Sequence, residues 1–407
     1  RCGTIDSPGV YTLNQSFSAT GTCLTINADN VTLDGNGYNI TGDDGTTDKG
    51  IAASSSRNAT VKNLKIIDFG YGIEFITGTD NLAINNTLDS NSYVGILLAG
   101  SNDQVINNTL NGNNYGIILD ASVNTSVIGG SINGSTNDAF WLFTDLGDGN
   151  NNTINSVPIT YTNSSVYDLK VEGMCSVGNC NIYLINMNIA NYSFASGTST
   201  LLIFRDTNFG EISFLSAVNG SGTNLSNDVR IGNNSVTVLS NVNSGLNKSA
   251  NVTLYGIGDR GFTSPAILRN GAGCGNLCYN FTSLTAGTVV FNVSYWTNYS
   301  IGEGDTTPPN VNIIYPANTT YNTNVSAINY TTGNSPQACW YTLNSGTTNT
   351  TVTCGNNATG LTSSEGSNTW KVYTNDSSNN VNSSSVTFVK DTVVPLISYG
   401  SGTETDS

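Results

Sequence analysis

A six-residue pattern recurs four times along the first third of the chain and decides its fold. The pattern reads Val-Lys-Asn-Leu-Lys-Ile at residues 61–66, Ala-Ile-Asn-Asn-Thr-Leu at 83–88, Val-Ile-Asn-Asn-Thr-Leu at 105–110 and Val-Ile-Gly-Gly-Ser-Ile at 127–132. Each segment starts 22 residues after the one before it. This regular spacing is typical of a solenoid, in which every repeat adds one coil to a continuous stack.

A second short strand is predicted between these segments. It reads Gly-Ile-Glu-Phe at residues 72–75, Gly-Ile-Leu-Leu at 95–98 and Gly-Ile-Ile-Leu at 116–119. Such strands are too short to be stable alone, whereas stacked coils hydrogen-bond to one another about 4.8 Å apart and share one apolar core. The repeat therefore predicts a right-handed parallel β-helix over residues 1–227, with looser coils beyond residue 139.

Paired asparagines fall at matching places in two successive repeats. Asn85 and Asn86 occupy the positions that Asn107 and Asn108 occupy one repeat later. Asparagines in register can stack as amide ladders, in which each side chain bonds to the coils above and below. Asparagine is also a common turn residue, and for any single position that interpretation stays open.

The rest of the sequence predicts further strands, so the expected fold class is all-β. Residues 235–238, 250–255 and 288–293 alternate between apolar and polar side chains, and they predict an antiparallel β capping module at 228–304. Regularly spaced strands at 305–391 favour an immunoglobulin-like sandwich. Residues 392–407 are interpreted as an extra strand or as the start of a further repeat.

Composition excludes several classes of partner. The 407 residues carry a formal charge of −15, only 10% are charged, and 37% are hydrophobic. A basic surface is needed to bind nucleic acid or an anionic membrane, and this chain has no basic run. The longest apolar stretches, such as residues 139–143, are far shorter than the ~20 residues that span a bilayer. We therefore expect no nucleic acid partner and no membrane-spanning segment.

The eight cysteines predict disulfides and an oxidising, extracellular location. Even number and local pairing favour disulfides, and the absence of histidine disfavours zinc. The expected pairs are Cys2 with Cys23, Cys175 with Cys180, Cys274 with Cys278, and Cys339 with Cys354.

Many Asn-x-Ser/Thr triplets make the chain a candidate glycoprotein, although a sequence so rich in these residues also produces them by chance. We expect some of these sites to carry glycans and others not to. The candidates are Asn30, Asn58, Asn85, Asn107, Asn124, Asn133, Asn163, Asn191, Asn224, Asn251, Asn292, Asn318, Asn349 and Asn382.

Acidic residues on the repeats raise the possibility of a polysaccharide lyase or hydrolase. Glycoside hydrolysis needs two carboxylates that face each other across the substrate. The acids of successive repeats do not align into a column, and arginine is scarce, so we interpret them as solvated surface groups and expect no catalytic residues. The acids considered are Asp68, Glu74, Asp89, Asp103 and Asp120.

Two Asp- and Gly-rich loops are weak candidates for a structural Ca²⁺ ion, and no other cofactor is expected. One loop is residues 43–48, and the other is residues 145–150, where Asp145 and Asp148 would be the ligands. Neither has the spacing of an EF-hand, and the same residue types form ordinary turns. The aromatic residues Phe140, Trp141 and Phe143 are expected to fill the core, whereas an exposed aromatic row would favour sugar binding.

The C-terminal segment predicts an unpartnered apolar strand. Residues 391–399 repeat the pattern of residues 305–313, which begin the predicted sandwich. The segment either begins another sandwich or adds to the edge of a neighbouring molecule, because free apolar strands are rarely tolerated in water. The residues of this candidate inter-subunit strand are Val393, Val394, Leu396, Ile397 and Tyr399.

Four segments together resemble a known class of protein. They are Cys-Gly-Thr-Ile at 2–5 with Gly-Val-Tyr-Thr-Leu at 9–13, residues 30–35, residues 246–255 and Asp-Thr-Thr-Pro-Pro at 305–309. The chain is similar to archaeal secreted cell-surface proteins with pectate-lyase-like β-helix repeats followed by immunoglobulin-like repeats. The resemblance implies a component of a cell envelope, S-layer or filament.

Our leading hypothesis is a non-catalytic, glycosylated structural subunit that self-assembles at the cell surface, with surface glycans as a further possible partner. The alternative is an adhesin or an enzyme that acts on polysaccharide. Contacts between identical chains would favour the first hypothesis, and a groove lined by acids and aromatic rings would favour the second.

Overall fold

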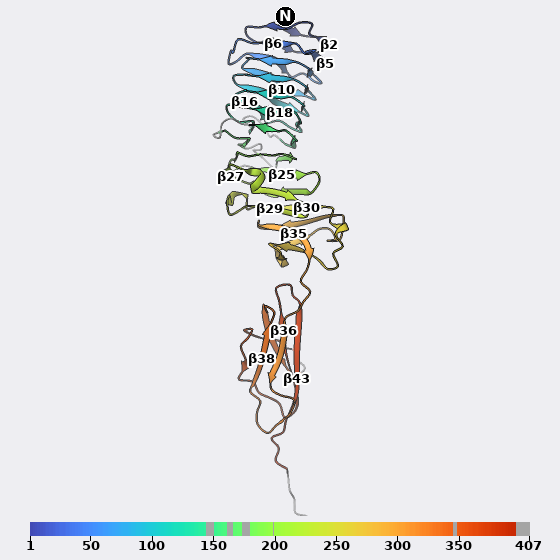
Figure 1. The fold of residues 1–407 in the computed structure, drawn as a ribbon, viewed down its shortest axis with the longest axis vertical. Helices are drawn as coiled ribbons and strands as arrows, with labels where there is room; N and C mark the ends of the chain where they lie inside the picture. Colours follow the sequence, from blue (N-terminus) through green and yellow to red (C-terminus); the bar gives the residue numbers. More distant parts are fainter. Residues whose placement is uncertain (144–149, 161–165, 173–179, 198, 345–347, 396–407) are drawn as a thin grey trace, which may run out of the picture. The chain divides into compact units, whose positions relative to one another are not determined.

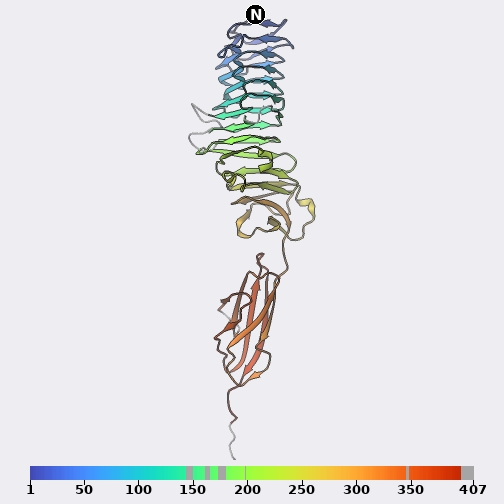
Figure 2. The ribbon, with the colours of Figure 1, turned by 60° about the vertical axis from the view of Figure 1, so that its left-hand side comes forward.

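The structure, a computed structural model, describes residues 1–143, 150–160, 166–172, 180–197, 199–344 and 348–395 (Figure 1). The chain forms two compact units, Arg1–Gly302 and Glu303–Ser407. Three sheets run through the first unit, and successive strands of each sheet come from successive coils (Figure 2). Among the described residues, no helix is long and apolar enough to cross a membrane.

The first sheet has ten strands and receives one from each coil. Its strands are β1 (Gly3–Ile5), β4 (Leu24–Ile26), β7 (Lys49–Ser54), β10 (Tyr71–Thr79), β13 (Val94–Ser101), β16 (Tyr115–Asp120), β19 (Phe140–Phe143), β22 (Leu169–Val171), β24 (Tyr192–Phe194) and β27 (Gly220–Gly222). All neighbours in this sheet are parallel except β24 and β27.

The second and third sheets complete each coil. The second sheet contains β2 (Gly9–Thr12), β5 (Val31–Asp34), β8 (Thr60–Lys62), β11 (Leu82–Ile84), β14 (Gln104–Ile106), β17 (Ser126–Ile128), β20 (Asn152–Asn155), β23 (Cys180–Ile185) and β25 (Thr200–Asp206) before its antiparallel end. The third sheet contains β3 (Phe17–Ser18), β6 (Asn39–Thr41), β9 (Lys65–Ile67), β12 (Thr87–Asp89), β15 (Thr109–Asn111), β18 (Ser131–Asn133) and β21 (Ile159–Thr160).

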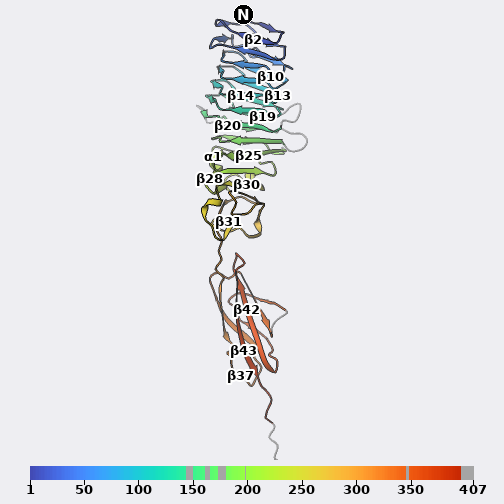
Figure 3. The same ribbon diagram turned by 90° about the vertical axis from the view of Figure 1, so that its right-hand side faces the viewer.

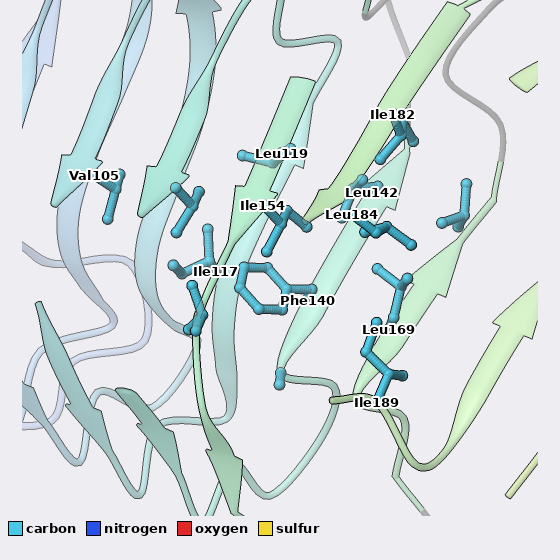
Figure 4. Close-up of a cluster of buried hydrophobic side chains, with 14 of the residues drawn as sticks. Val105, Ile117, Leu119, Phe140, Leu142, Ile154, Leu169, Ile182, Leu184 and Ile189 are labelled. Atoms are coloured by element: carbon cyan, nitrogen blue, oxygen red, sulfur yellow. The ribbon is translucent and has the colours of Figure 1, made fainter. Parts of the chain in front are cut away.

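Strand register confirms the predicted parallel β-helix. Val105 pairs with Ala83 in the coil before and with Val127 in the coil after, so the 22-residue sequence repeat is the structural repeat. Each six-residue pattern covers one strand of the second sheet, a corner, and one strand of the third. The inward side chains of successive coils pack on one another in a continuous buried core. The close-up in Figure 4 shows this packing around Val105, Ile154 and Phe140.

Left-handed residues make the corners of the coils. One column of corners consists of Asn58, Asp80, Asn102, Asn124 and Asn151, with φ of 55°, 61°, 57°, 54° and 54°. Positive φ is costly for most L-residues, but Asn and Asp tolerate it. This tolerance explains why asparagine and aspartate occupy these corners.

Antiparallel strands close the lower end of the β-helix. The second sheet continues from β25 through β26 (Gly210–Phe214), β30 (Ala250–Tyr255), β34 (Thr288–Val293) and β33 (Cys278–Asn280). Beside it lies a five-stranded sheet of β28 (Val229–Gly232), β29 (Ser235–Val238), β35 (Asn298–Glu303), β31 (Pro265–Arg269) and β32 (Ala272–Gly273). The helices within the described residues are short: α1 (Leu225–Asp228), η1 (Ser244–Leu246), η2 (Gly258–Arg260) and η3 (Gly275–Leu277). This part shares its apolar core with the coils.

The second unit contains two sheets around a separate core that includes Ile328, Trp370 and Phe388. One sheet is β36 (Asn310–Tyr315), β38 (Ala327–Gly333) and β41 (Ala358–Thr359). The other is β37 (Thr320–Tyr321), β43 (Val381–Lys390), β42 (Gly366–Asn375), β39 (Ala338–Leu343) and β40 (Thr350–Val352). Together with the β-helix, these sheets confirm the expected all-β fold class.

Three of the expected disulfides are present: Cys2–Cys23, Cys274–Cys278 and Cys339–Cys354. Cys180 is also disulfide-bonded. The predicted bond between Cys175 and Cys180 involves a residue outside the described part of the chain.

Removing the Cys339–Cys354 bond is expected to destabilise only the second unit. The bond joins residues 15 apart in sequence, and a loop of that length corresponds to about 3 kcal/mol in the chain-entropy account. Replacing both cysteines with alanine should lower the second unit's unfolding transition in differential scanning calorimetry. A shift in the transition of the first unit would contradict the assignment of this bond to the second core.

Candidate functional site

Polar side chains line three corners inside the central coils. Each follows a left-handed corner residue, points inward and is buried. They lie in three columns along the stack: Asn81, Asp103, Thr125 and Asn152 in the first, Asn86 and Asn108 in the second, and Asn91 and Asn113 in the third. The second and third columns are ladders of hydrogen-bonded side chains. In the first, Asp103 and Asn152 accept backbone N–H groups of the coil before, whereas the Thr125 hydroxyl has no hydrogen-bond partner among the described residues.

Each ladder satisfies backbone groups that the corners would otherwise leave unpaired. The side-chain oxygen of Asn108 accepts the backbone N–H of Asn86, one coil earlier, at 2.9 Å, and also the Asn86 amide at 3.0 Å. The Asn108 amide nitrogen donates to the carbonyl of Ala83 at 2.8 Å. Because buried N–H and C=O groups need partners, these side chains hold the coils in register.

The predicted amide ladder is present, and the structure divides its residues into two kinds. Asn86 and Asn108 are buried in the ladder, while Asn85 and Asn107 are exposed corner residues with φ of 55° and 53°. Sequence reasoning missed the other two columns. Their signal is a five-residue spacing inside each coil, at positions 81, 86 and 91 and again at 103, 108 and 113.

Asp103 replaces the amide in the first column and is completely buried. One carboxylate oxygen accepts the backbone N–H of Asn81 at 2.9 Å, and the other has no hydrogen-bond partner among the described residues. Burial raises the pKa of the Asp103 carboxyl to about 7, because the charged form loses hydration. The hydrogen bond from Asn81 opposes this pKa rise.

An outer aromatic row crosses the exposed face of the first sheet. It consists of Tyr71, Tyr93, Tyr115, Trp141 and Phe143, all half-buried, with successive ring centroids 4.8, 5.7, 5.0 and 4.2 Å apart. The expectation that Trp141 and Phe143 fill the core is wrong, although Phe140 does so. Side chains alternate along β19, so Phe140 and Leu142 point inward and the other two point outward.

Charged groups accompany the outer aromatic row at both ends. Lys49 lies 5.6 Å from the ring centroid of Tyr71, and Lys170 lies 5.1 Å from that of Trp141. The Trp141 indole N–H donates to Glu172 at 2.7 Å, and Glu172 pairs with Lys170 at 2.8 Å. Cation–π and charge-assisted contacts of this kind add to ring stacking.

Two of the acids considered from the sequence are engaged in ion pairs between coils. Glu74 pairs with Lys49, and its side chain is almost wholly buried. Asp89 pairs with Lys65 at 2.6 Å and accepts a hydrogen bond from the Asn111 amide at 2.7 Å. Both carboxylates therefore join neighbouring coils.

The remaining three acids lie apart in the coils. Asp68 is a left-handed corner residue, Asp103 is buried in the first column, and Asp120 is paired in strand register with Phe143. The structure thus gives these carboxylates three different environments.

Neither Ca²⁺ loop gains support as an ion site. In the loop at 43–48, the backbone N–H of Asp48 bonds to the Gly45 carbonyl, as in an ordinary turn. Asp145 and Asp148 lie outside the described residues. Among the residues that the structure does describe, no group of three His, Cys, Asp or Glu side chains could hold a metal ion.

A second aromatic pair lies on the larger sheet of the second unit. The rings of Trp340 and Tyr373, on adjacent strands, are 5.4 Å apart and 5° from parallel. The Lys371 ammonium lies 4.6 Å from the Tyr373 ring centroid. Both aromatic side chains are half-buried.

The coil region is similar to a family of periplasmic proteins. The family model described as NosD, a periplasmic copper-binding protein, matches residues 9–200, less than half of the chain. No curated protein matched. Among solved structures, ORF18 of Geobacillus virus E2 shares 9% identity over 74% of this chain and 68% of that chain, with a TM-score of 0.19. That likeness is too weak to bear on fold or function.

Copper, which that family description names, does not fit the donor groups of this chain. The sequence has no histidine, and none of the described cysteines is a free thiol. Of the two methionines, Met187 uses its sulfur to accept the backbone N–H of Val157 at 3.4 Å. Copper sites in proteins use imidazole, thiolate or thioether ligands in groups, and the part of the chain that the structure describes has no such group.

Proposed function

We propose that this chain is a non-catalytic structural subunit of an extracellular cell-surface assembly, such as a filament or an S-layer-like array. The proposal rests on the contacts that side chains make between neighbouring coils. Asparagines in the ladders, carboxylates in ion pairs and rings in the outer aromatic row connect each coil to the next. A stack reinforced in this way is suited to load-bearing.

Disulfides and family similarity support a location outside the cytoplasm. Disulfides persist in oxidising compartments, and the coil region is similar to a family described as periplasmic. Electron microscopy of native cell-surface material, labelled with antibodies against this chain, tests the proposal. Labelled filaments or arrays would support it, and label confined to dispersed single molecules would contradict it.

The proposed contact between subunits uses the C-terminal strand. Val393 and Val394 are 69% and 77% exposed, and the other apolar residues of the strand, Leu396, Ile397 and Tyr399, lie outside the described residues. Exposed apolar side chains in an extended segment can be covered by adding the strand to the edge of a sheet in another subunit. Repeating that contact head to tail produces a homopolymer.

Truncation tests strand donation. A chain ending at Lys390 and a Val394→Asp variant should sediment as monomers under conditions in which the intact chain assembles. Val242→Asp is the matched control, because Val242 is also 67% exposed and lies outside the strand. If the truncated chain assembles as the intact chain does, strand donation is wrong.

The proposed glycosylation should follow exposure of the asparagine side chains. Asn85, Asn107 and Asn318 are exposed and should carry glycans, whereas the half-buried Asn191 and Asn382 donate to the backbone carbonyls of Val166 and Pro309 at 2.9 and 3.0 Å. Glycopeptide mass spectrometry of native material should find the exposed group more highly occupied. Full occupancy at the two half-buried sites would contradict this ranking.

A second candidate function, a polysaccharide-binding adhesin, is favoured by the outer aromatic row. Half-exposed rings are the side chains that contact sugar faces in many binding sites. Affinity electrophoresis in neutral polysaccharide gels should show retardation that Trp141→Ala removes and Lys248→Ala leaves unchanged. Equal migration of native protein and the Trp141 variant in every gel would exclude the row as a sugar platform.

A further inference from the structure

A cavity opens where the third sheet of the β-helix stops. β21 is the last strand of that sheet, while the second sheet continues through β23 and β25. The cavity, of about 730 Å³, is lined by the ends of these two strands, by the segments that follow them, and by α1, β28 and β29. Figure 3 shows α1 and β28 close to β25. Small-molecule sites in proteins commonly have volumes of this size.

The cavity combines an apolar floor with a polar rim. Leu184 and Phe204 belong to the floor and are buried. The rim includes Arg205, Arg230, Asn188 and Asn208. An apolar surface with a few polar groups around it is the usual lining of a ligand site. The apolar surface supplies contact area, and the polar groups orient the ligand.

Arg230 is the cation available to a ligand here. Arg205 is already committed, because its Nε donates to Glu211 at 2.6 Å. Asp206 also lines the cavity, but its carboxylate accepts the backbone N–H groups of Asn208 and Phe209. Arg230 is exposed, and no ion pair within the described residues includes it. Its guanidinium can therefore pair with an anionic group of a ligand.

The two rim asparagines are available as well. Asn188 and Asn208 are exposed, and no hydrogen bond among the described residues uses their side-chain amides. Each amide offers a donor and an acceptor, which suits the hydroxyl groups of a sugar. A guanidinium binds a carboxylate with two parallel hydrogen bonds.

We infer that this cavity binds a carboxylate-bearing sugar. The carboxylate pairs with Arg230, the ring hydroxyls bond to Asn188 and Asn208, and the ring carbons face the apolar floor. This inference goes beyond the proposed structural role, and it uses none of the residues of the outer aromatic row or of the C-terminal strand.

Glucuronate and glucose make a matched pair of probes, because they differ only at the carboxylate. Saturation-transfer NMR on the intact chain, with competition titrations, should show binding of glucuronate at one site and at least about tenfold weaker binding of glucose. Acetate and inorganic phosphate should fail to displace glucuronate at equal concentration. Equal binding of glucose, or displacement by either simple anion, would overturn the inference.

Variants locate the site. Arg230→Gln should weaken glucuronate binding about tenfold or more, while Arg230→Lys should retain part of it. Arg260→Gln is the control, since Arg260 is also an exposed arginine and contacts Asn233 outside the cavity lining. If Arg230→Gln has a native circular dichroism spectrum and binds glucuronate as tightly as the native chain does, the assignment of Arg230 to the site is wrong. Assembly of the chain is not needed for this measurement, so its outcome is separate from that of the strand-donation test.

Discussion

Replacing Asn108 with leucine is expected to lower the free energy of unfolding of the first unit by about 3–5 kcal/mol. Leucine branches at the same carbon as asparagine but cannot accept or donate hydrogen bonds. The backbone N–H of Asn86 and the carbonyl of Ala83 would lose the partners that Asn108 supplies. Each buried group left unpaired costs about 1–3 kcal/mol, and the Asn86 amide also loses an acceptor.

The neighbouring Asn107 provides a matched control for this experiment. It is exposed and has a φ of 53°, a conformation that glycine adopts without strain. Asn107→Gly should therefore change the unfolding free energy by less than about 0.5 kcal/mol. Guanidinium denaturation of both unglycosylated variants measures the difference. If Asn108→Leu unfolds at the same concentration as the control, the apolar columns alone hold the register and the ladder is dispensable.

Stability of the first unit is expected to fall as the pH rises from 4 to 8, because of Asp103. Burial raises the pKa of this carboxyl to about 7 in the folded chain, from an ordinary value of 3.8. A carboxyl whose pKa is higher in the folded chain than in the unfolded chain stabilises the fold fully at pH values below its unfolded-state pKa. This stabilisation is lost as the pH rises through the folded-state pKa. The corresponding loss between these limits is at most about 4 kcal/mol.

Asp103→Asn should remove most of this pH dependence. Asparagine occupies the equivalent place at Asn81 and Asn152, so the column can accommodate an amide. The variant should be more stable than the native chain at pH 8 and similar to it at pH 4, as measured by thermal unfolding. Asp89→Asn is the control and should be destabilising at pH 8, because it loses an ion pair with Lys65. If the unfolding temperatures of the native and Asp103→Asn chains change with pH in parallel, the assignment of this pH dependence to Asp103 is wrong.

Local sequence determined the stacked part of the fold. The repeat at 61–66, 83–88, 105–110 and 127–132 is visible without a structure, because each coil repeats the same short pattern and pairs with the coil before and after it. Local pairing likewise predicted three of the disulfides, which join residues 4, 15 and 21 positions apart. The ladder in the second column was predictable for the same reason, from Asn86 and Asn108 one repeat apart.

Tertiary structure decided the features that depend on distant segments. Whether Trp141 points inward or outward changes with a one-residue shift of strand register, and composition does not determine that register. Asp103 looks like any other acid in the sequence, and only the coils stacked on both sides bury it and raise its pKa. The cavity beside Arg230 exists because the third sheet stops at β21 while the second continues, and no local sequence pattern marks that divergence.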